Sequence, residues 1–378
     1  MPPPSDVVAG NAPVRSGARW GWRALVAFVA GGLIAAAGFG AARVGLSDEA
    51  ETASAPTSAA SPDPTPTPTT VPEIRGTAPA PLGEPPADIE PAAFVAQVLG
   101  PAVVKLETGI GLGSGVLYDE NLVLTNFHVI EGATNLTVTL STGRVLPAEI
   151  VGTDPSTDVA VVRVETDEAL PLAELATGVK PQVGQLAVAI GSPFDLQQSV
   201  TQGIVSAVDR PIPNTETSVV AMIQTDAPIN PGNSGGALAD RFGRVIGINT
   251  SIQTDGFTST NVGVGFAIPI DTAVRIADLL VAGLPIEPGF LGVRGEEPPN
   301  GEVGVLLTEI TEDSAAESAG LQTGDRVLSL DGAPVSEMLE LAGLVLANQA
   351  GDTVVLEVVR DGELIEIEAV LGEREADN

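Results

Sequence analysis

Short aliphatic runs, many of them β-branched, alternate with turns rich in Gly, Asn and Asp from residue 90 to residue 283. Runs of this length without intervening helical periodicity are typical of an all-β barrel or sandwich. The one exception is a helix that we expect at 271–281, with Asp271 as its N-cap and its end near Gly283. We therefore expect a mainly-β domain over 90–283, with strands that include 102–106, 115–118, 136–140, 159–164, 185–190 and 245–249.

The segment 284–373 has a different pattern, in which strand-like runs are separated by two short helical stretches. The helices are expected at 314–318 and 338–347. This mixture predicts a second, smaller α/β domain, with strands at 303–307, 326–330, 353–359 and 364–370.

An uncharged apolar run from 24 to 42 follows Arg15, Arg19 and Arg23. Its length is about that needed to cross a ~30 Å hydrocarbon core, so it predicts a transmembrane helix. Arginines before the run and acids after it favour a cytoplasmic N-terminus. A cleaved signal peptide is the alternative, because small residues crowd the end of the run, but the run is long for a signal peptide. We expect a single-pass cell membrane protein with a cytoplasmic tail at 1–23 and its folded domains outside the cytoplasm.

Residues 43–89 are dominated by Ala, Ser, Thr and Pro, and they include Thr-Pro-Thr-Pro-Thr at 65–69. A segment of this composition cannot bury enough apolar surface to fold. We expect a disordered, semi-extended linker that holds the folded domains away from the membrane.

Composition excludes several classes of function. The chain has no Cys, so it can form neither a disulfide nor a cysteine nucleophile, and its one His cannot build a histidine metal cage. The formal net charge of −32 repels nucleic-acid phosphates, so we expect no nucleic-acid partner. We also predict no cofactor and no metal.

The one histidine, His128, follows an apolar run and precedes a Glu-Gly turn. A single loop histidine is more often only a solvated or hydrogen-bonded side chain. Asp158, however, stands directly before a fully apolar run, where a half-buried carboxylate needs a donor such as an imidazole N–H. A turn cap is the alternative interpretation of such an aspartate, and it suits Asp154, which precedes Pro155, better.

Ser234 lies within Gly-Asn-Ser-Gly-Gly at 232–236, where the glycines allow a tight backbone curl. The loop alone could be a plain hairpin turn. The curl can also aim the N–H groups of Gly232 and Ser234 at one point, as in an oxyanion hole. A serine becomes a nucleophile only beside a base whose tautomer is fixed by a third group. The chain order His128, Asp158, Ser234 is that of chymotrypsin-like enzymes, so we predict a catalytic triad.

Four segments together resemble the signature blocks of the HtrA/Deg family of serine proteases. They are Thr-Asn-Phe-His-Val at 125–129, Thr-Asp-Val-Ala-Val at 157–161, Gly-Asn-Ser-Gly-Gly at 232–236 and Gly-Val-Gly-Phe-Ala-Ile-Pro at 263–269. The resemblance extends from about residue 92 to residue 372. It implies a chymotrypsin-like pair of perpendicular six-stranded β-barrels with the active site in their cleft. It also implies a homotrimer, which nothing in the spacing or composition shows.

The same resemblance places the residue six positions before the nucleophile at the base of the S1 substrate pocket. That residue is Pro228, so the pocket lacks an acid that would attract Arg or Lys. We expect Pro228 and Ile229 to contribute to an apolar pocket for small or medium aliphatic side chains.

The segment 284–373 resembles the PDZ module of this family. Its strongest block is Ala-Gly-Leu-Gln-Thr-Gly-Asp-Arg-Val-Leu at 319–328, and Gly-Phe-Leu-Gly-Val at 289–293 stands in the place of the carboxylate-binding loop. Backbone N–H groups there would capture a C-terminal carboxylate while the bound peptide adds a strand to a sheet edge. An ordinary β-turn is the alternative for the phenylalanine taken alone. The predicted carboxylate-binding residues are Phe290, Leu291, Gly292 and Val293.

These observations together predict a serine endopeptidase that hydrolyses unfolded or damaged extracytoplasmic proteins, with a PDZ domain that binds peptide C-termini. A regulatory protease that cuts one specific membrane substrate is an alternative that the sequence does not separate from it. A non-proteolytic chaperone or scaffold would require a broken triad, and here the triad is complete.

Overall fold

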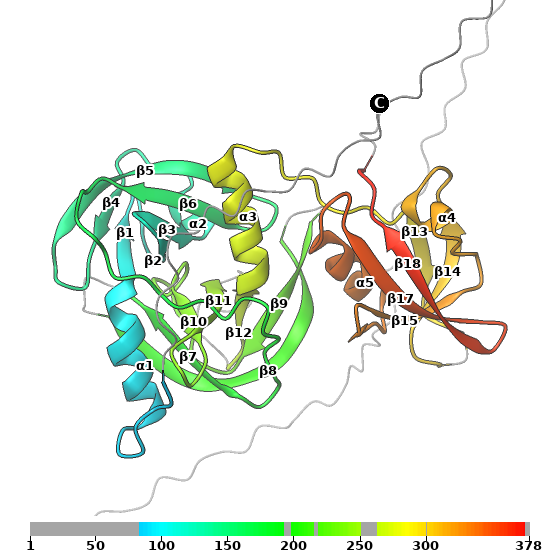
Figure 1. The fold of residues 1–378 in the computed structure, drawn as a ribbon, viewed down its shortest axis with the longest axis horizontal. Helices are drawn as coiled ribbons and strands as arrows, with labels where there is room; N and C mark the ends of the chain where they lie inside the picture. Colours follow the sequence, from blue (N-terminus) through cyan, green and yellow to red (C-terminus); the bar gives the residue numbers. More distant parts are fainter. Residues whose placement is uncertain (1–82, 193–197, 215–217, 251–262, 300, 375–378) are drawn as a thin grey trace, which may run out of the picture. The chain divides into compact units, whose positions relative to one another are not determined.

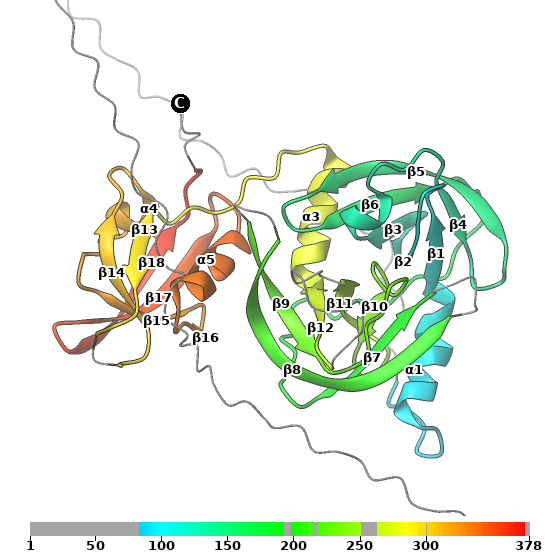
Figure 2. The same cartoon turned by 180° about the vertical axis from the view of Figure 1, so that it is seen from behind.

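A computed structural model describes residues 83–192, 198–214, 218–250, 263–299 and 301–374 (Figure 1 and, from behind, Figure 2). The predicted cytoplasmic tail, the predicted transmembrane helix and the part of the predicted linker before residue 83 lie outside these ranges. Of the helices within these ranges, none combines the length and the apolar character that a membrane span requires.

The first barrel closes from six antiparallel strands in the order β1-β2-β3-β6-β5-β4. On the paired strands β3 and β6, Val123, Leu124 and Val161 are completely buried. Since successive side chains of a strand point to opposite faces, β3 is covered on both faces. The runs predicted at 102–106, 115–118, 136–140 and 159–164 overlap four of these strands. The strands are β1 (Val103–Glu107), β2 (Leu112–Asp119), β3 (Leu122–Thr125), β4 (Thr137–Thr139), β5 (Val145–Asp154) and β6 (Val159–Val164).

The second barrel is also closed and antiparallel, in the order β10-β11-β12-β9-β8-β7. Its interior includes Ile223, Leu238 and Ile246, all of which are buried. The runs predicted at 185–190 and 245–249 overlap the first and fifth of its strands along the chain. The strands are β7 (Leu186–Gly191), β8 (Ser199–Pro213), β9 (Val219–Thr225), β10 (Ala237–Ala239), β11 (Val245–Thr250) and β12 (Gly265–Pro269).

Helix α3 (Ile270–Ala282) contacts strands of both barrels and shares their core through Ile276 and Ala277 (Figure 1). The predicted helix is therefore confirmed, and Gly283 ends it in the left-handed conformation, with φ 64°. The predicted N-cap is wrong. Because β12 runs directly into the helix, Pro269 occupies the cap position and Asp271 lies in the first turn, where its Oδ1 accepts the Gly178 N–H at 2.8 Å.

Three shorter helical segments complete this domain: α1 (Pro91–Leu99), η1 (Gly100–Ala102) and α2 (Phe127–Ile130). Helix α1 has a proline in its first turn, where no N–H is needed for an intrahelical bond, and it buries Val95 and Leu99. Helix α2 is a single turn that directly follows β3.

The C-terminal segment forms a separate sheet in the order β13-β14-β15-β17-β18, with β16 paired to β15. It has its own core, which includes Leu307, Val327 and Leu356. The strands and helices predicted for 284–373 all overlap observed elements. These are β13 (Val293–Glu296), β14 (Val305–Ile310), α4 (Ala315–Ser318), β15 (Arg326–Leu330), β16 (Ala333–Pro334), α5 (Met338–Leu346), β17 (Thr353–Arg360) and β18 (Glu363–Val370).

Candidate active site

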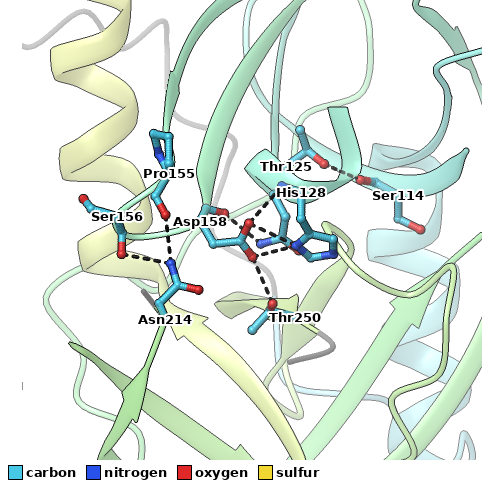
Figure 3. Close-up of polar contacts among 9 residues, drawn as sticks. Ser114, Thr125, His128, Pro155, Ser156, Asp158, Asn214 and Thr250 are labelled. Atoms are coloured by element: carbon cyan, nitrogen blue, oxygen red, sulfur yellow. Dashed lines mark hydrogen bonds and ion pairs between the residues drawn. The ribbon is translucent and has the colours of Figure 1, made fainter. Parts of the chain in front are cut away.

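The structure places His128 and Asp158 in direct contact (Figure 3). His128 Nδ1 lies 2.8 Å from Oδ2 and 3.0 Å from Oδ1 of Asp158, and the backbone N–H of His128 donates to Oδ1 at 2.9 Å. The histidine side chain is 39% exposed, whereas the aspartate side chain is 8% exposed. The carboxylate therefore holds the Nδ1 edge of the imidazole and orients the ring.

Asp158 itself is held from several directions. Its φ of 60° lies in the left-handed region, which costs an ordinary residue about 1–2 kcal/mol but which Asp tolerates better than most. Its carbonyl accepts hydrogen bonds from the Phe127 N–H and from Asn126 Nδ2, both at 3.1 Å. Thr250 Oγ1 donates to Oδ2 at 3.0 Å. Sequence reasoning missed Thr250, because no spacing rule links the end of β11 to this aspartate, and it included Asn126 only as a member of the 125–129 block.

The turn before Asp158 is organised by Asp154, as its predicted role of turn cap requires. Asp154 Oδ1 accepts the Ser156 N–H at 3.0 Å and the Ser156 hydroxyl at 2.6 Å, and Oδ2 accepts the Thr157 hydroxyl at 2.5 Å. From the β8–β9 hairpin, Asn214 Nδ2 donates to the Ser156 carbonyl at 3.0 Å (Figure 3). Ser218 Oγ donates to the same carbonyl at 2.7 Å.

The loop that carries Ser234 is a tight, hydrogen-bonded curl between β9 and β10. The Asn233 N–H donates to the Asn230 carbonyl and the Gly236 N–H donates to the Asn233 carbonyl, both at 2.9 Å. Ser234 is buried, and its carbonyl accepts the N–H of Ser114 on β2 at 2.8 Å. The loop is thereby joined to the first barrel, which also carries His128 and Asp158.

Two glycines of this loop have backbone angles that favour glycine. Gly232 has φ 98° and Gly235 has φ 80°. A Cβ at Gly235 would also lie 2.1 Å from the carbonyl oxygen of Ser114 and 2.3 Å from Thr125 Oγ1. Gly235 is therefore required both by its conformation and by the close approach of β2.

The predicted substrate-pocket residues lie at the start of the same loop. Pro228 is exposed, and its carbonyl accepts the Thr201 hydroxyl at 2.9 Å. Ile229 is buried in the core of the second barrel, and its Cγ1 lies 2.5 Å from where a Cβ would stand on Gly265. The absence of a side chain on β12 thus makes the space that Ile229 fills.

In the C-terminal domain, the four predicted carboxylate-binding residues line one groove together with side chains of α5 such as Leu341 and Val345. Phe290 exchanges hydrogen bonds with the backbone of Gly372, and Gly292 has φ 80°. Gly292 also has no room for a side chain, because its Cβ would lie 2.3 Å from the Ser314 Cβ. Among the described residues, no group of three or more acidic or histidine side chains is placed to hold a metal ion.

Two closed barrels and a separate six-stranded sheet define a trypsin-like peptidase domain followed by a PDZ domain. Residues 113–248 match the trypsin-like peptidase domain family, and residues 289–371 match the PDZ domain family.

Solved structures and curated relatives give the same assignment. The structure of the HtrA-type protease AlgW with a tripeptide is 34% identical, with a TM-score of 0.58, and the match covers 76% of this chain and 98% of that one. The structure of AlgW with a decapeptide is 30% identical, with a TM-score of 0.54, and the match covers 76% of this chain and 100% of that one. The chain belongs to the HtrA/Deg family of serine proteases.

Two curated relatives are named as periplasmic enzymes. A probable periplasmic serine endoprotease DegP-like of Pseudomonas fluorescens is 42% identical over 69% of this chain and 56% of its own length. The periplasmic pH-dependent serine endoprotease DegQ of Escherichia coli is 39% identical over 69% of this chain and 59% of its own length. The matched part of the chain thus spans a little over half the length of these two relatives.

Proposed function

We propose that the chain is a serine endopeptidase in which Ser234 is the nucleophile, His128 the general base and Asp158 the residue that orients His128. The observation that carries the proposal is the contact of a buried carboxylate with Nδ1 of the partly exposed His128, at 2.8 and 3.0 Å. This contact keeps the proton on Nδ1 and leaves Nε2 as the proton acceptor.

The reaction then follows from the roles of the three residues. His128 Nε2 takes the proton of Ser234 as its Oγ attacks the scissile carbonyl, and Asp158 stabilises the imidazolium that forms. The N–H groups of Gly232 and Ser234 are proposed to stabilise the oxyanion. The imidazolium returns its proton to the leaving amine, which gives an acyl-enzyme. Water, activated by the same histidine, hydrolyses this intermediate and regenerates the hydroxyl.

The proposed substrates are unfolded or damaged proteins outside the cytoplasm, in agreement with the periplasmic relatives. Pro228 and Ile229 supply no charge to the proposed S1 pocket, which favours small or medium aliphatic residues at the cleaved position. The proposed PDZ site at 290–293 binds peptide C-termini. The tripeptide and decapeptide in the AlgW structures are consistent with peptide binding in this family.

The finer organisation of the chain is also proposed. The protease domain would occupy 90–283 and the PDZ domain 284–373. The run at 24–42 would anchor the chain in the cell membrane, with 43–89 as a linker, and the family resemblance supports a homotrimer.

Labelling with a peptide phosphonate that reacts with activated serines tests the catalytic assignment. The wild-type chain should be labelled, whereas Ser234→Ala and His128→Ala should not be, and both variants should keep the wild-type circular dichroism spectrum. Equal labelling of wild type and Ser234→Ala would reject Ser234 as the nucleophile.

A further inference from the structure

Ser114 lies on β2 in the first barrel, is completely buried, and makes hydrogen bonds to the loop of Ser234 in the second barrel. Its N–H donates to the Ser234 carbonyl at 2.8 Å, and its hydroxyl donates to the Gly232 carbonyl at 2.6 Å. The hydroxyl oxygen also accepts the Ser192 N–H at 2.8 Å. Its carbonyl accepts the Thr125 hydroxyl at 2.7 Å (Figure 3).

These bonds fix two peptide planes at both of their ends. In the Gly232–Asn233 plane, the carbonyl is held by the Ser114 hydroxyl and the N–H is held by the Asn230 carbonyl at 2.9 Å. In the Ser234–Gly235 plane, the carbonyl is held by the Ser114 N–H and the N–H is held by the Asn249 carbonyl at 2.9 Å.

The plane between these two contains the N–H of Ser234, which is one of the two proposed oxyanion donors. The carbonyl of this plane, that of Asn233, accepts the Gly236 N–H at 2.9 Å, and this bond together with the two fixed neighbouring planes sets the direction of the Ser234 N–H. The bond from the Ser114 hydroxyl restrains the Gly232 carbonyl at a residue that, with φ 98° and no side chain, has few steric limits of its own on rotation. Preorganised donors are what makes an oxyanion hole effective, since no reorganisation is needed during the reaction.

We propose that Ser114 is a positioning residue for the oxyanion hole, which acts through the carbonyl of Gly232. The inference rests on the proposed role of Ser234 and adds to it a residue from the opposite barrel. The backbone N–H of Ser114 would survive any substitution except proline, so the proposal concerns its hydroxyl alone.

A purely structural role of the hydroxyl gives a different expectation. Ser114→Ala would leave the partly buried Gly232 carbonyl and the buried Ser192 N–H without this partner, which costs stability whatever the role of the loop. Thr108 provides a matched control, because its buried hydroxyl also donates to a backbone carbonyl and accepts a backbone N–H, both of Gly111 at 3.2 and 3.0 Å. Thr108→Val removes the same kind of bonds away from the Ser234 loop.

The test compares Ser114→Ala, Ser114→Cys and Thr108→Val in the full chain, with Ser234→Ala as the inactive reference. The measurements are kcat and KM for a small chromogenic peptide, the affinity for a peptide aldehyde that forms a tetrahedral adduct, and the melting temperature. Loss of one oxyanion donor typically lowers kcat by about 100- to 1,000-fold, so Ser114→Ala should lower kcat by about 10- to 100-fold with KM within about threefold. Aldehyde affinity should fall by a similar factor.

Ser114→Cys, whose thiol is a weaker donor of similar size, should give an intermediate kcat. Thr108→Val should lower the melting temperature and leave kcat and aldehyde affinity near wild type. If Ser114→Ala does not fold, the kcat values of Ser114→Cys and Thr108→Val are compared instead, and a loss in Ser114→Cys alone supports the proposal.

The proposal is overturned if the folded Ser114 variants keep kcat within about threefold of wild type, or if Thr108→Val lowers kcat by as much as they do. A wild-type chain no more active than Ser234→Ala would instead reject the proposed function, so the two failures are distinguishable.

Discussion

The hydroxyl of Thr250 donates a hydrogen bond of 3.0 Å to Oδ2 of Asp158, the same oxygen that lies 2.8 Å from His128 Nδ1. Thr250 ends β11 of the second barrel, whereas Asp158 directly precedes β6 of the first. The carboxylate that orients the histidine is therefore held in place by the barrel that carries Ser234.

Thr250→Val should lower kcat without a comparable change in KM. A hydrogen bond to a charged group contributes about 1.5–3 kcal/mol, which corresponds to about a 10- to 100-fold rate effect if the bond matters fully in the transition state. Thr139→Val is the control. Thr139, on β4, also donates to a carboxylate, but this carboxylate belongs to Glu107 on β1 and not to Asp158. Steady-state kinetics on a peptide substrate would check this, and an equal kcat for the two variants would contradict it.

Asp158→Asn should abolish most activity and leave the fold intact. Asn tolerates the left-handed backbone of this position, so the substitution changes the chemistry and not the conformation. The amide presents an N–H₂ group where either His128 or Thr250 needs an acceptor, which disfavours the productive tautomer. Asp154→Asn, in the same turn, keeps one acceptor oxygen and should mainly lower the melting temperature. Similar kcat losses in the two variants would argue against a special role for Asp158.

Much of this arrangement could be predicted from the sequence. The β6 strand at 159–164 and the β15 strand at 326–330 match their predicted bounds to the residue, because each is a largely buried, mostly aliphatic run even though it includes an arginine. His128, Asp158 and Ser234 stand out because each occurs in a short block of unusual composition.

The contacts that support these residues could not be predicted. Ser114 and Thr250 are ordinary strand residues in the sequence, and their importance depends on how two barrels closed by non-local strand pairing meet. The N-cap predicted at Asp271 failed for a related reason. Propensity favours an aspartate at a helix start, but the register of β12 carries the chain into the helix at Ile270 instead.

Gly235→Ala should eliminate phosphonate labelling of Ser234 and destabilise the protease domain. The left-handed backbone alone costs about 1–2 kcal/mol, and the added Cβ would lie 2.1 Å from the Ser114 carbonyl oxygen. Gly143→Ala isolates the backbone cost, because Gly143 has φ 84° and nothing within 4 Å of its Cβ position. Chemical denaturation and labelling of both variants would check this. A loss of stability in Gly235→Ala no larger than in Gly143→Ala would mean that the clash is relieved.

The stability of the first turn of α5 should depend on pH through the ionisation of Glu340. Burial alone would raise the pKa of Glu340, but hydrogen bonds from the Ser336 hydroxyl, the Ser336 N–H and the Glu337 N–H hold this pKa below its ordinary value. A carboxyl with a depressed folded-state pKa contributes stability above its unfolded-state pKa, and that stability is lost as pH falls through the folded-state pKa.

Glu340→Gln should therefore lower the melting temperature of the PDZ domain at pH 7, and its difference from wild type should shrink as the pH approaches about 3. Glu366→Gln on β18 is the control, because Glu366 is exposed. Calorimetry between pH 3 and pH 7 would measure this, and a difference independent of pH would contradict the expected role of the charged carboxylate.

Peptide binding by the PDZ domain should depend on a free C-terminal carboxylate in spite of the charge of the domain. Residues 284–378 contain 21 acidic and 4 basic residues, a net charge of −17 that opposes an anionic ligand at long range. Affinity must therefore come from short-range contacts: N–H groups near Gly292, hydrogen bonds of an added strand, and the apolar groove that includes Phe290 and Val293. Screening by salt weakens the repulsion, so binding of a neutral or acidic peptide with an apolar C-terminal residue should strengthen as salt rises.

The measurement is a titration of free-acid and C-terminally amidated forms of one such peptide at two salt concentrations. The free acid should bind more tightly than the amide at both, and its affinity should gain more from added salt, because only the free acid carries the repelled terminal charge. A chain that ends near Gly283 should lose this binding and keep some hydrolysis of small peptides, since the proposed triad lies before that residue. Equal affinity for the two forms of the peptide would show that the Gly292 loop does not capture a carboxylate.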